Sequence, residues 1–219
     1  MSRRDNALAR CPTCHMHATL CICDLVPRLA ARTRLSLLVH YREARKPTNT
    51  GLLAARCLER SEVGIVGDRA RPLELPVVRP GELGVLLYPD EDAVPIAHYT
   101  ASARPIVLVV PDGSWRQAGK MRRRVPGLGE LPCVTLPPTM PTTYRLRAEP
   151  RSGGLATLEA IAQAFGILEG DRGAPIEAAL LAVFRVMVDR TLWLRGALRD
   201  AEVTGGVPAA AIARDPRGP

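Results

Sequence analysis

The chain has 219 residues, 47% of them hydrophobic, a size that suits one large domain or one domain with a small appendage. It contains no uncharged apolar run of about eighteen residues, which excludes a predicted transmembrane helix. Its charged first residues lack the apolar segment of a signal peptide, so we expect a cytoplasmic protein. The net charge of +8 and the pI near 9.7 favour a polyanionic partner such as RNA.

Four of the six cysteines lie close together near the start of the chain. They are spaced as Cys-x-x-Cys, six residues, then Cys-x-Cys, and comprise Cys11, Cys14, Cys21 and Cys23. In a reducing compartment this spacing favours a tetrahedral zinc ion over disulfides. Four thiolates leave no open coordination position, so the metal is predicted to be structural. His15 and His17 are alternative ligands. Residues 1–30 are predicted to form a zinc-binding module too small to bury a core of its own.

The middle of the chain predicts strands that alternate with helices. Short aliphatic runs predict strands over 35–39, 63–66, 85–88, 106–110 and 134–136, and apolar spacing predicts helices over 51–59, 155–168 and 176–199. This alternation indicates an α/β fold with a mostly parallel sheet flanked by helices, placed at 31–202. Residues 203–219 are rich in Gly, Ala and Pro and are expected to form a flexible tail.

Polar residues follow several of these predicted strands. His40 ends the first strand and is a candidate base or an ordinary turn residue. Thr50 precedes the predicted helix 51–59, whose N-terminus is expected to bind a carboxylate or phosphate, with an ordinary N-cap by Asn49 or Thr50 as the alternative. Residues 144–147 alternate like an extended segment, so Arg145 and Arg147 are expected to point the same way, toward RNA phosphate or a carboxylate.

The segment from Ile106 to Ala118 reads as a buried strand, a tight turn and a helix start. Pro111 is expected to end the strand, and Asp112 or Ser114 to cap the helix that begins near Trp115. Ligands of open α/β sheets bind at the carboxyl ends of strands, which makes Asp112 and Trp115 candidates for catalysis. The alternative is a capped helix with a buried tryptophan.

A cluster of cations follows Trp115 and is predicted to contact RNA phosphates. It consists of Arg116, Lys120, Arg122, Arg123 and Arg124. The alternative interpretation is a solvated basic helix face.

The sequence Asp112-x-x-Trp115, followed by Arg116-Gln117-Ala118, resembles the signature of the DTW-domain family of tRNA-uridine aminocarboxypropyltransferases, bacterial type. Ser114 stands where threonine is usual. Other family-like segments occur in the expected order at 11–23, 49–51, 86–93 and 144–162, so the resemblance covers nearly the whole chain.

The resemblance implies a SPOUT-like, trefoil-knotted catalytic domain that binds S-adenosylmethionine through three loops. These loops follow Tyr88, run from Val110 to Trp115, and run from Leu136 to Thr157. The implied cofactor-binding residues are Thr50, Leu87, Tyr88, Val109, Val110, Leu136, Arg145, Leu155 and Thr157. The chain lacks the G-x-G-x-x-G fingerprint of dinucleotide-binding folds, which fits a different mode of cofactor binding.

The implied reaction moves the 3-amino-3-carboxypropyl group of S-adenosylmethionine to N3 of a tRNA uridine and releases 5′-methylthioadenosine. Asp112 is the candidate base, with orientation of the uracil or of the cofactor amine as alternatives. Trp115 is expected to stack on a flipped base or to wall the pocket. The alternative functions are a SPOUT-like RNA methyltransferase and a non-catalytic zinc-ribbon RNA-binding protein. A monomer is expected.

Overall fold

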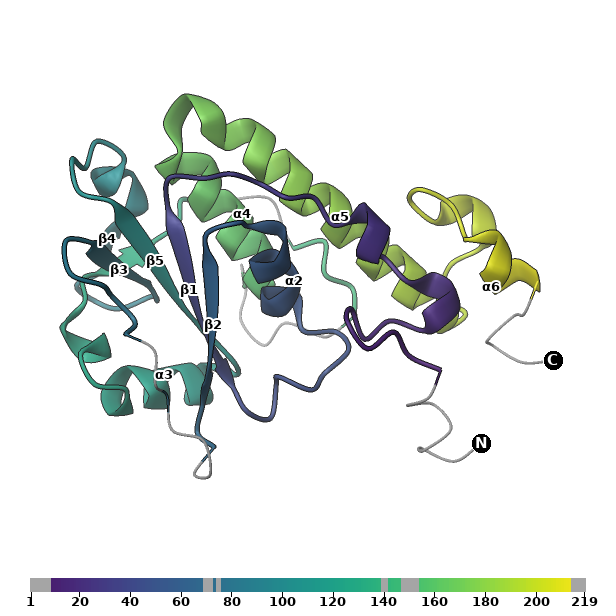
Figure 1. Cartoon of the computed structure of the whole chain (residues 1–219), viewed down its shortest axis with the longest axis horizontal. Coiled ribbons are helices and arrows are strands. Elements are labelled where there is room, and N and C mark those ends of the chain that lie inside the picture. Colours follow the sequence, from purple (N-terminus) through teal and green to yellow (C-terminus); the bar gives the residue numbers. More distant parts are fainter. Residues whose placement is uncertain (1–8, 69–72, 74–75, 139–141, 147–153, 214–219) are drawn as a thin grey trace.

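The protein folds around a six-stranded parallel sheet with helices on both faces (Figure 1). The computed structural model describes residues 9–68, 73, 76–138, 142–146 and 154–213. Its strands are β1 (Arg34–His40), β2 (Ser61–Val66), β3 (Leu83–Leu87), β4 (Val94–Pro95), β5 (Ile106–Asp112) and β6 (Cys133–Thr135), in the order β2-β1-β5-β3-β6-β4. The predicted parallel α/β class is confirmed; the trefoil knot and the SPOUT assignment stay predictions.

Two hydrophobic cores lie on opposite faces of this sheet. One contains residues of α2 (Thr50–Cys57), α4 (Thr157–Leu168) and α5 (Gly173–Leu194), and the other contains residues of α3 (Trp115–Arg124). Side chains alternate along β5, so Leu108 and Val110 enter the first core while Val107 and Val109 enter the second. Both faces of the central strands are therefore buried, as their continuous aliphatic runs predict.

The cysteine-rich segment packs into the first core. Met16, Leu20 and Ile22 are at most 3% exposed and belong to the same hydrophobic cluster as α4 and α5. The buried Arg190 of α5 donates a hydrogen bond to the carbonyl oxygen of Cys21 at 2.7 Å. The segment is thus fastened to the main domain and, as expected from its size, relies on that domain for burial.

Strand β5 runs two residues further than predicted. Pro111 pairs in register with Leu38, and Asp112 pairs with Val39 of β1. The interpretation of Pro111 as the strand end was wrong because its fixed φ suits an extended strand, and its missing N–H removes only one ladder bond near the end. Asp112 is therefore the last strand residue, and Ser114 alone provides the helix N-cap.

Two predicted helices are shifted along the chain. Helix α5 begins at Gly173 and ends at Leu194, where we expected 176–199. Pro175 fits the first turn, because the N–H that proline lacks is unbonded there anyway. At the other end Gly196 takes a φ of 73°, a left-handed conformation that stops the helix. Helix α4 begins at Thr157, so Leu155 precedes it.

The expected extended segment 144–147 is not a strand in its described part. Residues 142–146 form irregular chain and a turn, and Arg147 lies outside the described residues. The carboxylate of Glu159 determines this path by accepting bonds from the N–H of Thr143 at 2.8 Å and the hydroxyl of Thr142 at 2.5 Å. Local alternation of side chains gives no sign of this long-range anchor.

Residues 203–213 differ from the flexible tail that we expected. Val203 is buried, Thr204 donates two hydrogen bonds to the carboxylate of Asp189, and the short helix α6 (Ala209–Ala213) buries Ala211. Helix α6 contacts the short 3-10 helix Ala18–Leu20 of the cysteine-rich segment. A few buried contacts order a stretch whose composition suggests disorder. Among the described helices, none has both the length and the apolar character needed to cross a membrane.

Candidate active site and metal centre

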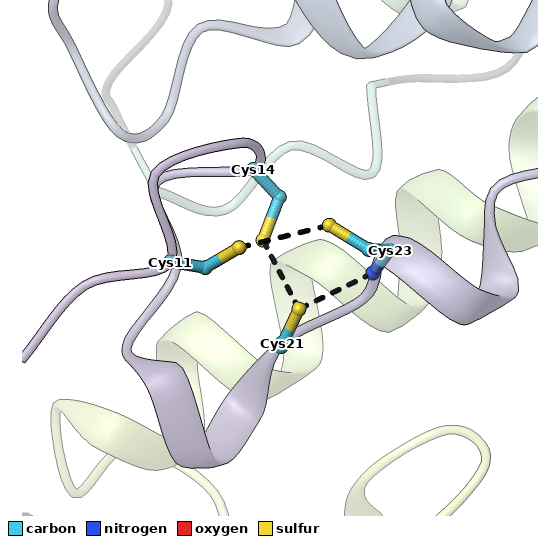
Figure 2. Close-up of side chains that lie close together, drawn as sticks. All are labelled: Cys11, Cys14, Cys21 and Cys23. Carbon is cyan, nitrogen blue, oxygen red and sulfur yellow. Dashed lines mark hydrogen bonds between the residues drawn. The ribbon is translucent and has the colours of Figure 1, made fainter.

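The four clustered cysteines converge on one point (Figure 2). The Cys11 and Cys23 sulfurs lie 3.7 Å apart, as do those of Cys14 and Cys21, and all four lie within 4.8 Å of one another. Four thiolates at a Zn–S distance of about 2.3 Å around a tetrahedral ion would lie about 3.8 Å apart. The four cysteines therefore form a site that fits structural zinc. In the described residues this metal-binding group includes no histidine, in agreement with the predicted ligand set.

Backbone and cationic donors surround these sulfurs. Hydrogen bonds from the N–H groups of Cys14 and Thr13 lower the pKa of Cys11 to about 6, whereas burial raises that of Cys21 to about 12. The guanidinium of Arg56 in α2 donates to the Cys23 sulfur at 3.4 Å. A divalent cation at the centre would favour the thiolate form of all four cysteines. Arg56 would then orient a ligand from outside the coordination sphere and link the metal centre to α2.

Asp112 lies at the carboxyl end of the central strand β5 and is only 6% exposed. Its Oδ2 accepts a hydrogen bond from the Asn49 amide at 2.5 Å, and its Oδ1 accepts one from the Thr157 hydroxyl at 2.5 Å. These two donors stand at the N-termini of α2 and α4. The carboxylate therefore joins three elements at one edge of the sheet, and both donors are uncharged.

Glycine at position 51 permits this close arrangement. A Cβ on Gly51 would lie 3.2 Å from each of three atoms: Asp112 Cγ, Leu37 Cδ1 and Thr157 Cγ2. Asn49 also caps α2, because its Oδ1 accepts the N–H of Leu52 at 2.8 Å. The Asn49 amide is thereby fixed with its NH₂ group toward Asp112.

Trp115 and Tyr88 lie beside this edge. Their rings meet edge to face with centroids 6.3 Å apart, and the guanidinium of Arg122 lies 5.7 Å from the Tyr88 centroid. Arg122 also forms an ion pair with Asp90 in the loop after β3. A hollow of about 670 Å³ opens between Tyr88 and the end of α3, with Arg122, Arg123 and Arg124 in its wall. Tyr88 thus borders a basic, open surface, and Trp115 lies against Tyr88.

The remaining cations of α3 project into solvent. Arg116, Lys120, Arg123 and Arg124 are exposed, and none of them forms an ion pair with another described residue. Elsewhere, arginines such as Arg34 and Arg145 pair with carboxylates. The positive charge of α3 is consequently available for a polyanion.

The predicted cofactor-binding residues occupy varied environments. Val109 and Val110 are buried in opposite cores, so their side chains serve packing. The Thr50 hydroxyl accepts the N–H of Leu158 at 3.3 Å and joins α2 to α4. Arg145 forms a 2.8 Å ion pair with Asp189 of α5. The half-buried members of the set are Leu87, Tyr88, Leu136, Leu155 and Thr157.

The three predicted pocket loops come from neighbouring strands. Strand β3 lies between β5 and β6, so the segments after Leu87, Asp112 and Thr135 begin at the same edge of the sheet. Part of the third segment lies outside the described residues. The N-cap alternative at the start of α2 is confirmed, with Asn49 as the capping residue. The sequence did not predict the contact of Asn49 with Asp112, the capping box of Gln117 or the contacts of Glu159 with residues 142–143. The spacing Ser114-x-x-Gln117 is a capping-box signal, but nothing local marks the other two contacts.

The fold and the site together define a parallel α/β protein with a four-thiolate metal centre and a polar cluster at the carboxyl edge of its sheet. Comparison with known proteins narrows this class. The DTW domain profile matches residues 8–192, and the chain belongs to the DTW domain family.

Related proteins carry a consistent name. The chain is 29% identical over 171 residues to tRNA-uridine aminocarboxypropyltransferase 2 of Drosophila melanogaster, covering 75% of this chain and 68% of the relative. It is 29% identical over 168 residues to the Mus musculus protein of the same name, covering 73% of this chain but only 56% of the relative. The chain thus spans little more than half of the mouse relative.

The structural comparison matches one solved structure over most of the chain, at a low TM-score. The SAM-dependent rRNA:acp-transferase Tsr3 from Vulcanisaeta distributa superposes with a TM-score of 0.44 and 14% identity, over 82% of this chain and 88% of that chain.

Proposed function

We propose that this chain transfers the 3-amino-3-carboxypropyl group of S-adenosylmethionine to N3 of a uridine in tRNA and releases 5′-methylthioadenosine. The match of the DTW domain over 8–192 carries the proposal, and the shared name of the relatives supports it. A SPOUT-like knotted domain, a monomeric state and a cytoplasmic location belong to the same proposal.

The three loops at the carboxyl edge would hold S-adenosylmethionine, which supplies an electrophilic carbon next to its sulfonium. The adjacency of β5, β3 and β6 supports this placement, because their loops border one region. Tyr88, Leu136 and Thr157 would line the pocket. Thr50, Leu87, Leu155 and the main chain of Val109 and Val110 would support its walls. Arg145 would meet a carboxylate or RNA phosphate if its ion pair with Asp189 opened.

Asp112 would accept the N3 proton of the uracil or orient the base. Its carboxylate oxygens accept hydrogen bonds from the uncharged donors Asn49 and Thr157, and a carboxylate can accept about four hydrogen bonds in all. Trp115 is the first residue of α3, follows the strand end at Asp112 after Gly113 and Ser114, and is half-buried, so it offers an aromatic surface to a base. The reaction depends on which carbon of the sulfonium faces N3, so rigid positioning decides the product.

The exposed cations of α3 would bind the tRNA backbone. Phosphate contacts fix the position of an RNA without reading its sequence. Arg116, Lys120, Arg123 and Arg124 meet this need because they lack ion-pair partners among the described residues. The proposed RNA-binding set also includes Arg122, which forms an ion pair with Asp90. Its last member is Arg147, which lies outside the described residues.

Mass spectrometry of nucleosides from unmodified tRNA incubated with the protein and S-adenosylmethionine tests the proposal. We expect a uridine heavier by one aminocarboxypropyl group, together with released 5′-methylthioadenosine. A methylated nucleoside with S-adenosylhomocysteine would instead indicate a methyltransferase. Absence of S-adenosylmethionine binding in a titration would indicate a non-catalytic RNA-binding protein.

A further inference from the structure

The orientation of the Gln117 side chain is fixed by the start of α3. The N–H of Ser114 donates to Gln117 Oε1 at 2.7 Å, and the N–H of Gln117 faces the Ser114 hydroxyl oxygen at 3.4 Å. Because the amide oxygen is occupied by a backbone donor, the Nε2 amino group points the other way. It lies 3.2 Å from Nδ1 of His40 at the end of β1.

This contact determines the tautomer of His40. An amide nitrogen can only donate, so Nδ1 must accept. The N–H of Arg42 also points to Nδ1, at 3.3 Å. Burial, with the nearby charges of Arg42 and Lys120, lowers the pKa of His40 against the opposing effect of Glu43. The imidazole is therefore neutral, with its proton on Nε2.

The Nε2–H group of His40 can donate a hydrogen bond to a ligand. No described residue accepts a hydrogen bond from it, and His40 is half-buried. A Cβ on Gly67 would lie 3.5 Å from Nε2, so the glycine, with φ of 86°, leaves the approach open. His40 directly follows Val39, which pairs with Asp112, so this donor stands at the same edge as the proposed catalytic cluster.

We propose that His40 Nε2–H, together with Lys120 and Arg42, binds a phosphate of the RNA substrate, and that Gln117 is the residue that positions this donor. The inference rests on the proposed function, because it takes RNA as the substrate. An N–H donor with two cations near its ring, Arg42 and Lys120, suits an anionic oxygen. The protonated Nε2 cannot act as the base toward uracil, so the site serves binding and orientation.

Nitrogen-15 NMR of the histidine ring tests the tautomer without any substrate. We expect the proton on Nε2 in the wild-type protein. Gln117→Glu keeps an oxygen for the Ser114 N–H and places the second oxygen opposite Nδ1, so this variant should carry a proton on Nδ1. A wild-type ring protonated on Nδ1 alone, or a ring whose protonation pattern is the same in Gln117→Glu, would overturn the assignment.

Binding of unmodified tRNA, measured by fluorescence anisotropy without S-adenosylmethionine, tests the ligand. His40→Phe keeps a ring but removes the donor, and we expect about tenfold weaker binding. His40→Gln retains an N–H near the position of Nε2 and should stay within about threefold of wild type. Affinity for S-adenosylmethionine should be unchanged in both variants, and circular dichroism would verify that they fold.

Two results would contradict the proposal. Wild-type affinity of His40→Phe for tRNA would remove His40 from the RNA site. Loss of S-adenosylmethionine affinity in place of tRNA affinity would show that the anionic group is the carboxylate of the donor molecule. Either result would leave the proposed transfer reaction standing. By contrast, a wild-type protein that binds tRNA but transfers no group would overturn the proposed function and leave the His40 proposal standing.

Discussion

At the scale of single residues, Asp112 shows what side-chain alternation along a strand can predict and what it cannot. Residues 108, 110 and 112 share one side of β5, so Asp112 faces α2 and α4 while His40, on the side of Leu38, faces α3. The run of aliphatic residues and the following Asp predict a strand-end carboxylate. Its partners cannot be predicted in this way, because Asn49 and Thr157 are 63 and 45 residues away in the sequence.

Replacing Asp112 by Asn should abolish transfer while preserving the fold. The variant's Oδ1 can accept from Asn49, and its NH₂ group can donate to the Thr157 hydroxyl, which both donates and accepts. Loss of a general base costs about 10²- to 10⁴-fold in rate. Single-turnover assays with mass spectrometry would measure the loss, and thermal unfolding would report the fold. Activity within about threefold of wild type would exclude Asp112 as the base.

At the scale of elements, strands and helices were largely predictable, and their junctions less so. The Ser114-x-x-Gln117 spacing signals the start of α3, and the structure has both bonds of that capping box. Helix α4 has only half of such a box. The N–H of Ala156 donates to the Glu159 carboxylate, but Ala156 has no side-chain oxygen that could accept the N–H of Glu159. The Glu159 carboxylate also accepts hydrogen bonds from residues 142–143, and no local sequence pattern indicates the path of that loop.

Ser114→Ala should lower the free energy of unfolding by about 1 kcal/mol, the usual effect of losing an N-cap side chain. The backbone N–H of residue 114 still donates to Gln117, so the contact between Gln117 and His40 should survive. Urea denaturation would give the stability change, and the His40 ring spectrum would check the contact. A change in the His40 tautomer in this variant would contradict the backbone origin of the Gln117 orientation.

The buried ion pair between β1 and the turn before β3 predicts a pH dependence. Arg34 forms two bonds to Glu82, at 2.5 and 2.8 Å, and the hydrogen bond from Arg34 is the largest cause of the lowered pKa of Glu82. A carboxyl whose pKa is lower in the folded state contributes stability above its unfolded pKa of about 4.3, and this contribution disappears as pH falls through the folded pKa. Acid should therefore weaken the link between these elements.

Glu82→Gln should cost about 3–5 kcal/mol at neutral pH, because it leaves Arg34 buried with only part of its ion pairing. The free energy of unfolding of the wild type should decrease below about pH 4.3, and this decrease should be smaller in the variant. Chemical denaturation across this pH range would measure both effects. Glu202→Gln is the control, because its partner Arg199 is fully exposed and little change is expected. Parallel pH profiles for wild type and Glu82→Gln would contradict the prediction.

At the scale of the whole molecule, the sheet order and the attachment of the metal-binding segment are not readable from the sequence. The order β2-β1-β5-β3-β6-β4 depends on long crossovers, which local patterns do not specify. The cysteine spacing did predict that the four thiols gather at a site that fits zinc, since four thiolates on two short turns have few other uses. That Met16, Leu20 and Ile22 enter the main core follows only from the tertiary structure.

Metal removal should therefore affect the whole domain. We expect one zinc ion per chain by elemental analysis, and a chelator or Cys14→Ser should lower the thermal midpoint by about 10 °C, since several kcal/mol of metal-linked stability disappear. Cys133→Ser, which alters a buried cysteine outside the cluster, should retain one zinc ion whatever its stability. Full metal content in Cys14→Ser would exclude the four-cysteine site.

The final prediction concerns long-range charge. Neutralising Lys120 and Arg124 by alanine should weaken tRNA binding and reduce the slope of log affinity against log salt by about 0.7–0.9 for each phosphate that the protein no longer neutralises. The control removes the same charge elsewhere: Arg172→Ala with Arg199→Ala, two arginines that pair with glutamates of the C-terminal part of the chain. Both double variants have the same net charge, so a diffuse attraction would lower both slopes equally. A specific RNA-binding surface on α3 requires a smaller slope in the variant that lacks Lys120 and Arg124 and an unchanged slope in the control. The reason is that the slope counts the counterions released when protein cations contact phosphates, and only the first variant would lose such contacts.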